Sequence, residues 1–166
     1  MSTTIHTSIT SRGSTHFLRF AILVLAAIAL ALGVFALPYL YVEVTEAYLG
    51  PISIMVGLLY LSVLPFAFTL WQALKLLRYI DQNAAFSASS VQALRSIKYC
   101  AVIMSLLFFG CMPVVYLIAE ADDAPGLIIL GGMFACAPLV IAVFAAVLER
   151  LLQNAIDIKT ENELTV

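Results

Sequence analysis

The sequence predicts an all-α polytopic membrane protein, a bundle of four transmembrane helices with both termini in the cytoplasm. Of its 166 residues, 63% are hydrophobic and only 11% are charged, which is too apolar for a soluble domain of this size. Four stretches also lack Lys, Arg, His, Asp and Glu entirely: residues 20–42, 47–74, 99–119 and 124–148. Each holds at least 21 residues. A helix of that length crosses the hydrocarbon of a bilayer, about 30 Å thick, at about 1.5 Å per residue.

The charged residues are sorted between these stretches. All eight Lys and Arg lie in the first tail, the middle connection and the last tail. The two short connections hold five acids and no base: Glu43, Glu46, Glu120, Asp122 and Asp123. Lys and Arg beside a span favour the cytoplasmic side. The inner segments total 61 residues and the outer ones eight, so the crowding of bases at span ends is the stronger indication of this topology.

The sequence divides into one membrane domain and two tails. Residues 1–15, rich in Ser and Thr, are predicted to be a disordered cytoplasmic tail. Residues 16–158 form the four-helix transmembrane domain, and residues 159–166 a polar C-terminal tail. The spans are expected at about residues 18–41, 50–75, 98–119 and 125–149.

The first span follows Arg19 and is expected to remain uncleaved. Its apolar run is longer than the ~7–15 residues of a signal-peptide core, and Leu37-Pro38-Tyr39 is a poor cleavage site. Gly50-Pro51 opens the second helix, where the missing proline N–H costs nothing. The helical pattern then continues past Leu74 to about Ile80, so this helix should protrude into the cytoplasm.

Ser87 is a good N-cap for the third helix, which carries an apolar stripe that Arg95 and Lys98 avoid. Pro125-Gly126 opens the fourth helix, which continues amphipathically over residues 149–156. Three prolines lie inside spans: Pro65, Pro113 and Pro138. Two interpretations of them stay open: simple kinks that neighbouring helices tolerate, or broken helices that bind an ion.

No catalytic residue, cofactor site or metal site is predicted. No ionisable side chain lies inside a span, which argues against a proton-coupled transporter. The sequence lacks the G-x-S-x-G, H-E-x-x-H and glycine-rich phosphate-loop motifs. The three cysteines, all within spans, are expected to be small apolar fillers. The protein is therefore predicted not to be an enzyme.

Two polar regions remain as candidate sites. The turn between the second and third helices offers a partner-contact surface made of Asp81, Asn83, Phe86, Ser87, Arg95 and Lys98. For the bases near it, anionic lipid head groups are the favoured explanation, and a protein partner on this turn is the alternative. The second region is an outer acidic rim of Glu43, Glu46, Glu120, Asp122 and Asp123. It would attract cations or a basic peptide, or it simply reflects membrane topology.

The run from Leu76 to Ser87, with Ser90-Val91 and Ile97-Lys98-Tyr99, resembles the signature of a bacterial family called "domain of unknown function 2975". The resemblance extends over about residues 12–166. It implies a four-helix protein of the bacterial cytoplasmic membrane. Genes of this family often stand beside a small helix-turn-helix regulator, which is the partner that the resemblance implies. Gln82 and Ala84 stand where the family often has lysine, which weakens a charge-driven contact.

These observations favour a non-enzymatic membrane protein that anchors or senses a cytoplasmic partner such as that regulator. The alternative is a small transporter, exporter or immunity-type factor for an apolar or cationic compound. The expected partners are the lipid bilayer, the regulator and a second copy in a homodimer. Direct nucleic-acid binding is not expected, because the chain has no recognition fold and little excess positive charge.

Overall fold

The structure, a computed structural model, describes residues 6–31, 38, 50–82, 84 and 86–164. The described residues form helices only: α1 (His6–Ala31), α3 (Pro51–Asp81), α4 (Ala88–Ala121) and α5 (Gly126–Leu164). Of these, α3, α4 and α5 are long and apolar enough to cross a membrane. The apolar part of α1 is shorter, Arg19–Ala29, because the rest of the first predicted span falls largely outside the described residues.

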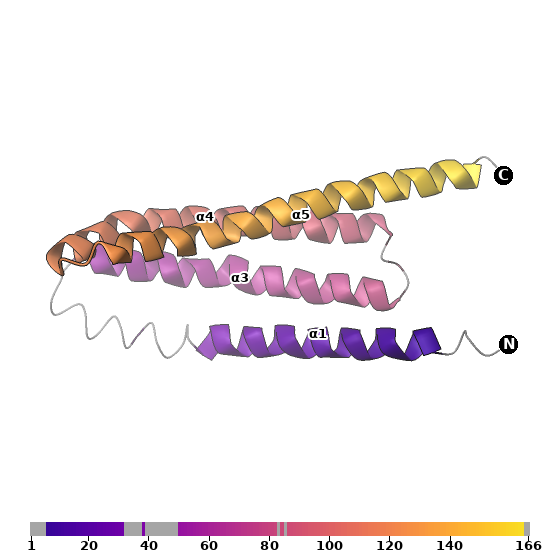
Figure 1. Ribbon diagram of the computed structural model, residues 1–166, viewed down its shortest axis with the longest axis horizontal. Coiled ribbons are helices and arrows are strands. Elements are labelled where there is room, and N and C mark those ends of the chain that lie inside the picture. Colours follow the sequence, from indigo (N-terminus) through magenta and orange to yellow (C-terminus); the bar gives the residue numbers. More distant parts are fainter. Residues whose placement is uncertain (1–5, 32–37, 39–49, 83, 85, 165–166) are drawn as a thin grey trace.

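The helices lie side by side in chain order, each antiparallel to the next (Figure 1). Within the described part, α4 packs between α3 and α5, whereas α1 packs on α3 and has no comparable contact with α5. The described helices of the predicted four-helix bundle are thus arranged as an open row. Lipid tails solvate apolar side chains as well as another helix does, so nothing forces the row to close around a core.

Small side chains make up much of the buried set, and many large apolar side chains point outward. At the α4–α5 interface Ala101, Ala135 and Ala142 are at most 4% exposed. By contrast, Leu64, Ile129 and Phe144 are each at least 66% exposed. Small residues let helix backbones approach closely in lipid, where packing rather than water exclusion drives association. The distribution is that of a protein whose solvent is hydrocarbon.

The helix ends follow from local sequence. Gly50, at a φ of 110°, precedes α3, and Pro51 occupies its first turn. The prediction of Ser87 as N-cap is confirmed, since its side chain accepts a hydrogen bond from the Ser90 N–H. At the far end of α4, Asp123 adopts a left-handed φ of 50°, and the Ala124 N–H bonds to the Ala119 carbonyl. This 6→1 bond is the Schellman way of ending a helix.

Both predicted tails differ from the structure. Helix α1 begins at His6, so residues 6–15 are helical rather than disordered. Helix α5 continues to Leu164, so residues 159–164 are helical as well. Once an apolar segment has nucleated a helix, each further residue adds a hydrogen bond without a new nucleation cost, and polar flanks extend the helix.

The helices α3, α4 and α5 run through Pro65, Pro113 and Pro138 without interruption, which supports kinks over broken helices. Most hydroxyls at depth bond their own helix: Ser62 donates to the Leu59 carbonyl and Thr69 to the Pro65 carbonyl. Ser105 instead donates across to the Ala135 carbonyl of α5 at 2.8 Å. No buried side-chain nitrogen or oxygen among the described residues lacks a hydrogen-bond partner.

Candidate functional site

The polar chemistry gathers at one end of the row. This end, called the basic end below, carries the turn of residues 82–87, the start of α1 and the charged part of α5 (Figure 1). Helix α5 has 39 residues, about 58 Å at the α-helical rise, so it is much longer than the hydrocarbon thickness. Its last turns extend beyond the 82–87 turn (Figure 1).

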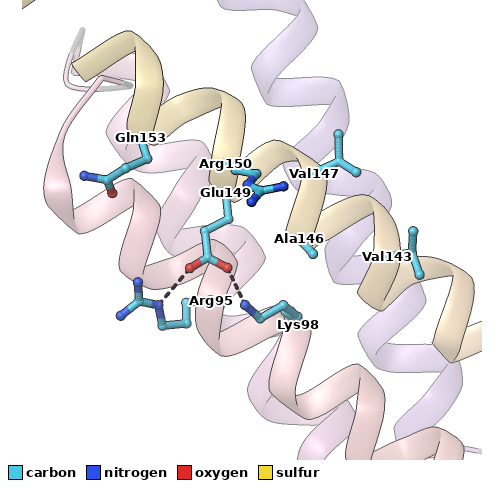
Figure 2. Close-up of a pocket in the computed structure, with 8 residues that line it drawn as sticks. All are labelled: Arg95, Lys98, Val143, Ala146, Val147, Glu149, Arg150 and Gln153. Carbon is cyan, nitrogen blue, oxygen red and sulfur yellow. Dashed lines mark hydrogen bonds and ion pairs between the residues drawn. The ribbon is translucent and has the colours of Figure 1, made fainter. Parts of the chain in front are cut away.

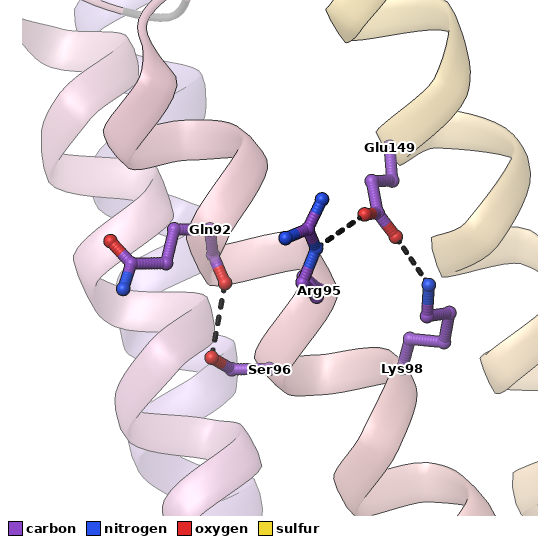
Figure 3. A network of polar contacts seen from close by, with 5 residues as sticks. All are labelled: Gln92, Arg95, Ser96, Lys98 and Glu149. Atoms are coloured by element: carbon purple, nitrogen blue, oxygen red, sulfur yellow. Dashed lines mark hydrogen bonds and ion pairs between the residues drawn. The ribbon is translucent and has the colours of Figure 1, made fainter.

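A three-residue ion-pair cluster joins α4 to α5 at this end. The Arg95 Nε lies 2.8 Å from the Glu149 Oε1, and the Lys98 Nζ lies 2.6 Å from its Oε2 (Figure 3). Arg95 and Lys98 are three residues apart on one helix, so both reach the same carboxylate. Glu149 is the first charged residue after the apolar stretch 124–148. The cluster thus fixes the register of the two helices where they leave their apolar segments.

The two cations keep Glu149 ionised. Hydrogen bonds from Lys98 and Arg95 hold the pKa of Glu149 below its usual range, against a smaller opposing effect of burial. The same hydrogen bond and the charge of Glu149 raise the pKa of Arg95. The Glu149 side chain is 12% exposed, and the Arg95 side chain is 59% exposed. Glu149 is therefore the enclosed centre of the cluster, and Arg95 is its open edge.

A hollow of about 650 Å³, the basic groove, lies beside this cluster (Figure 2). Its rim is polar and its floor is made of small and branched apolar side chains. It is lined by Arg95, Lys98, Val143, Ala146, Val147, Glu149, Arg150 and Gln153. The groove combines three bases and one acid, so it carries a net positive charge.

A second hollow of about 370 Å³, the apolar groove, lies between the ends of α3, α4 and α5. It is lined by Leu76, Ile80, Phe86, Leu94, Leu148, Leu151, Leu152 and Ala155. Helical spacing of about 100° per residue puts the α5 residues of the two grooves on opposite faces of α5. The α4–α5 interface therefore separates a basic groove from an apolar one.

The structure separates the predicted partner-contact residues. Asp81 forms an ion pair with Arg19 of α1, and Ser87 caps α4. Arg95 and Lys98 belong to the basic groove, whereas Phe86, 61% exposed, borders the apolar groove. Asn83 lies outside the described residues. The five described residues of this predicted surface thus belong to different environments.

Three important residues were not predicted from sequence. Glu149 and Arg19 were treated only as charges of the connections, and Leu151 only as part of an amphipathic helix. The available signal was the position of Glu149 directly at the end of an apolar stretch, opposite Lys98 at the start of another. Opposite charges at two adjoining span ends are able to pair across neighbouring antiparallel helices.

The remaining bases of the basic end have other surroundings. The Lys75 Nζ lies about 6 Å from the rings of both Trp71 and Tyr79, at 6.0 and 5.9 Å. Arg78 and Arg150 have no ion pair with any described residue. These two arginines are thus exposed cations at the same end of the molecule, one outside the basic groove and one within it.

The predicted outer acidic rim is only partly described. Glu120, Asp122 and Asp123 are exposed at the turn between α4 and α5, whereas Glu43 and Glu46 lie outside the described residues. Among the described residues, no three His, Cys, Asp or Glu side chains gather in a way that would hold a metal ion. Contact between the acidic residues of the two connections remains a prediction.

Comparison with known proteins identifies relatives along most of the chain. The family described as "Protein of unknown function (DUF2975)" matches residues 39–166. The "Uncharacterized membrane protein YoaS" of Bacillus subtilis (strain 168) is 50% identical over 159 residues, which cover 94% of this chain and 99% of that protein. No solved structure matches the chain.

Proposed function

Since the chain belongs to the DUF2975 family and is a bacterial integral membrane protein with several transmembrane helices, we propose that it is a membrane anchor or sensor for a cytoplasmic partner protein. In this proposal the chain crosses the membrane four times, and the basic end faces the cytoplasm. The protein catalyses no reaction and needs no cofactor. It acts by holding its partner at the membrane surface.

The apolar groove is the observation that carries this proposal. Phe86 and Leu151 border it and are 61% and 60% exposed, although both lie beyond the charge-free stretches of their neighbouring helices. Exposed apolar surface outside hydrocarbon is costly, at about 25 cal/mol per Å², and it typically marks a binding site. Ile158, 62% exposed on the continuation of α5, extends the apolar surface further from the membrane.

The shape and chemistry of this groove suit an amphipathic helix. Three helix ends supply its walls, and all eight lining side chains are apolar. An incoming helix would fill it with apolar side chains at three- and four-residue spacing. A small helix-turn-helix regulator, the partner that the family resemblance implies, has helices of this kind. The membrane protein would bind the regulator and make no contact with DNA itself.

Transport receives less support than docking. None of the charge-free stretches contains an ionisable side chain that could couple movement of a solute to ions. A hollow of about 400 Å³ does lie between α3, α4 and α5 at depth, lined by Met55, Leu59, Phe108, Cys111, Met112, Val115, Gly131 and Phe134. Its lining offers no polar side chain to orient a solute. Lipid tails match such a surface well.

Co-purification with the neighbouring regulator tests the proposal. Phe86→Asp and Leu151→Asp each place a carboxylate in the apolar groove, and both native side chains are exposed, so folding should be retained. We expect each variant to lower regulator binding at least tenfold. The matched control is Ser89→Asp, which adds the same charge on an exposed position of the first turn of α4, outside the groove.

Two outcomes would reject this docking function. One is that the regulator fails to bind the detergent-solubilised wild-type protein. The other is that the groove variants and Ser89→Asp retain equal amounts of it. In that case any association would depend on the charge of this end, and the apolar groove would have no role.

A further inference from the structure

The basic groove has an arrangement that the docking proposal does not use. Its polar rim and its apolar floor follow one another along α5. Arg150 and Gln153 line it beyond the charge-free stretch, whereas Val143, Ala146 and Val147 line it within that stretch. Arg150 and Val143 are seven residues apart, about 10 Å along the helix axis. The groove thus changes from cationic to apolar at the point where α5 enters the membrane.

The rim retains hydrogen-bond donors after the ion pairs are formed. Arg95 uses only its Nε on Glu149, and its two terminal nitrogens point away from that carboxylate (Figure 2). Lys98 uses one of its three N–H groups on Glu149. Arg150, exposed on the other side of the groove, has no ion pair with a described residue. These donors suit a phosphate group, which accepts bidentate bonds from arginine.

We propose that the basic groove binds one anionic phospholipid. The phosphate lies at the rim lined by Arg95, Lys98 and Arg150, and the first part of an acyl chain lies on Val143, Ala146 and Val147. Basic pockets between transmembrane helices are suited to anionic lipid head groups. Glu149 lies at the same rim, and its carboxylate is already paired with Lys98 and Arg95.

The apolar floor selects a lipid over other anions. Inorganic phosphate would bind the rim, but it has no apolar part that could pack on Val143 and Val147. These side chains are 59% and 51% exposed and would stay uncovered. An acidic peptide would have to place its backbone polar groups in hydrocarbon to reach that floor, which costs several kcal/mol per group. A diacyl phospholipid satisfies both parts, because its phosphate and its chains lie in that order along the membrane normal.

The test compares two arginines of the basic end. Native mass spectrometry of the detergent-solubilised protein measures binding of phosphatidylglycerol and of phosphatidylcholine with identical acyl chains. We expect the wild-type protein to prefer phosphatidylglycerol. Arg150→Gln should weaken phosphatidylglycerol binding about fivefold, as expected for one base near a membrane surface. Arg78→Gln removes the same charge outside the groove and should change binding less than about twofold.

Two further measurements test the apolar floor of the groove and its polar rim separately. Ala146→Leu fills the floor without changing charge and should also weaken phosphatidylglycerol binding. Inorganic phosphate at millimolar concentration should leave lipid binding unchanged, because a free anion lacks the apolar contact. Circular dichroism and thermal unfolding of each variant show that a loss of binding does not come from a loss of fold.

Three results would overturn the lipid site. Equal weakening by Arg150→Gln and Arg78→Gln would show diffuse attraction to the whole basic end. Displacement of phosphatidylglycerol by inorganic phosphate would show a site for a free anion. Equal binding of phosphatidylcholine and phosphatidylglycerol by the wild-type protein would show that the rim does not recognise charge.

Discussion

Glu149 holds the two longest helices together at the point where they leave the apolar region. Its carboxylate accepts hydrogen bonds from both Arg95 and Lys98 of α4. Glu149→Gln would remove the negative charge and leave two cations facing a neutral amide. We expect the midpoint of thermal unfolding in detergent to fall by a few degrees at neutral pH. The control is Glu120→Gln. Glu120 is exposed and forms no ion pair with a described residue, so its replacement should leave the midpoint unchanged.

The stabilisation by Glu149 should also depend on pH. The pKa of Glu149 is lower in the folded protein than in an unfolded chain, where it is about 4.3. The contribution is therefore complete above about pH 4.3 and disappears as the pH falls through the lowered value. Unfolding midpoints of wild type and Glu149→Gln should converge on acidification. A difference that stays constant with pH would show that packing, and not charge, is responsible.

Ser105 makes the other specific link between α4 and α5. It is 2% exposed, and its hydroxyl donates to the Ala135 carbonyl, one of the residues that precede Pro138. Hydrogen bonds between membrane helices contribute about 0.6 kcal/mol on average and about 1.7 kcal/mol at most. Ser105→Ala should therefore lower the free energy of unfolding by about 0.5–1.5 kcal/mol.

Denaturation in mixed micelles measures this loss, and Ser96→Ala is the matched control. The Ser96 hydroxyl bonds only to the Gln92 carbonyl of its own helix (Figure 3). Its removal should change the free energy of unfolding very little. If both serine variants lowered the free energy of unfolding by the same amount, the bond between the helices would contribute no more than the bond within one helix.

At the scale of the element, the spacing of α4 and α5 depends on one of two adjacent glycines. A Cβ added at Gly131 would lie 3.2 Å from both the Met112 Sδ and the Val115 Cγ1. A Cβ added at Gly132 would meet nothing within 4 Å. The β-branched Val115 has few rotamers with which to move away. A Cβ at position 131 therefore requires Met112 and Val115 to shift by a few tenths of an ångström.

The pair Gly131→Ala and Gly132→Ala isolates this effect. Both substitutions gain helix propensity of up to about 1 kcal/mol. Only Gly131→Ala must also displace Met112 and Val115, at a cost of about 1–3 kcal/mol. We expect Gly132→Ala to be neutral or stabilising and Gly131→Ala to be less stable than it by at least about 1 kcal/mol. Equal unfolding free energies would mean that the interface adapts freely.

Sequence reasoning succeeded where structure is local. Charge-free length predicted α3, α4 and α5, and the hydroxyl of Ser87 predicted the start of α4, because each depends on residues within a few turns. The cross-helix contacts were not predictable in the same way. Ser105 and Ala135 are 30 residues apart, and Lys98 and Glu149 are 51 residues apart. Their meeting depends on the register of two helices, which hydropathy does not encode.

The candidate site was predictable only in its location. Charge sorting placed the candidate surface at the end where both grooves lie, but it grouped Asp81, Phe86 and Arg95 as one surface. In the structure Asp81 pairs with α1, Phe86 borders the apolar groove and Arg95 borders the basic groove. The separation arises because α5 lies between the two grooves, and one helix presents different residues on its opposite faces.

For the molecule as a whole, the docking proposal requires one orientation in the membrane. The apolar groove can receive a cytoplasmic regulator only if the basic end faces the cytoplasm. The start of α1 and the end of α5 lie at this same end (Figure 1). The positive-inside rule gives this orientation, since the bases cluster there and the acidic 120–123 segment lies opposite. Orientation is thus the premise of the docking proposal, and it decides in which leaflet the basic groove would meet its lipid.

Single cysteines at the two ends of α4 test this orientation. The three native cysteines, all free, are first replaced by alanine. Asp122→Cys and Ser89→Cys then place one thiol at an exposed position of each end. In intact cells a membrane-impermeant maleimide should label Asp122→Cys and spare Ser89→Cys until the membrane is opened. The reverse labelling would put both grooves outside the cell and remove the regulator as a partner, while lipid binding would then have to occur in the outer leaflet.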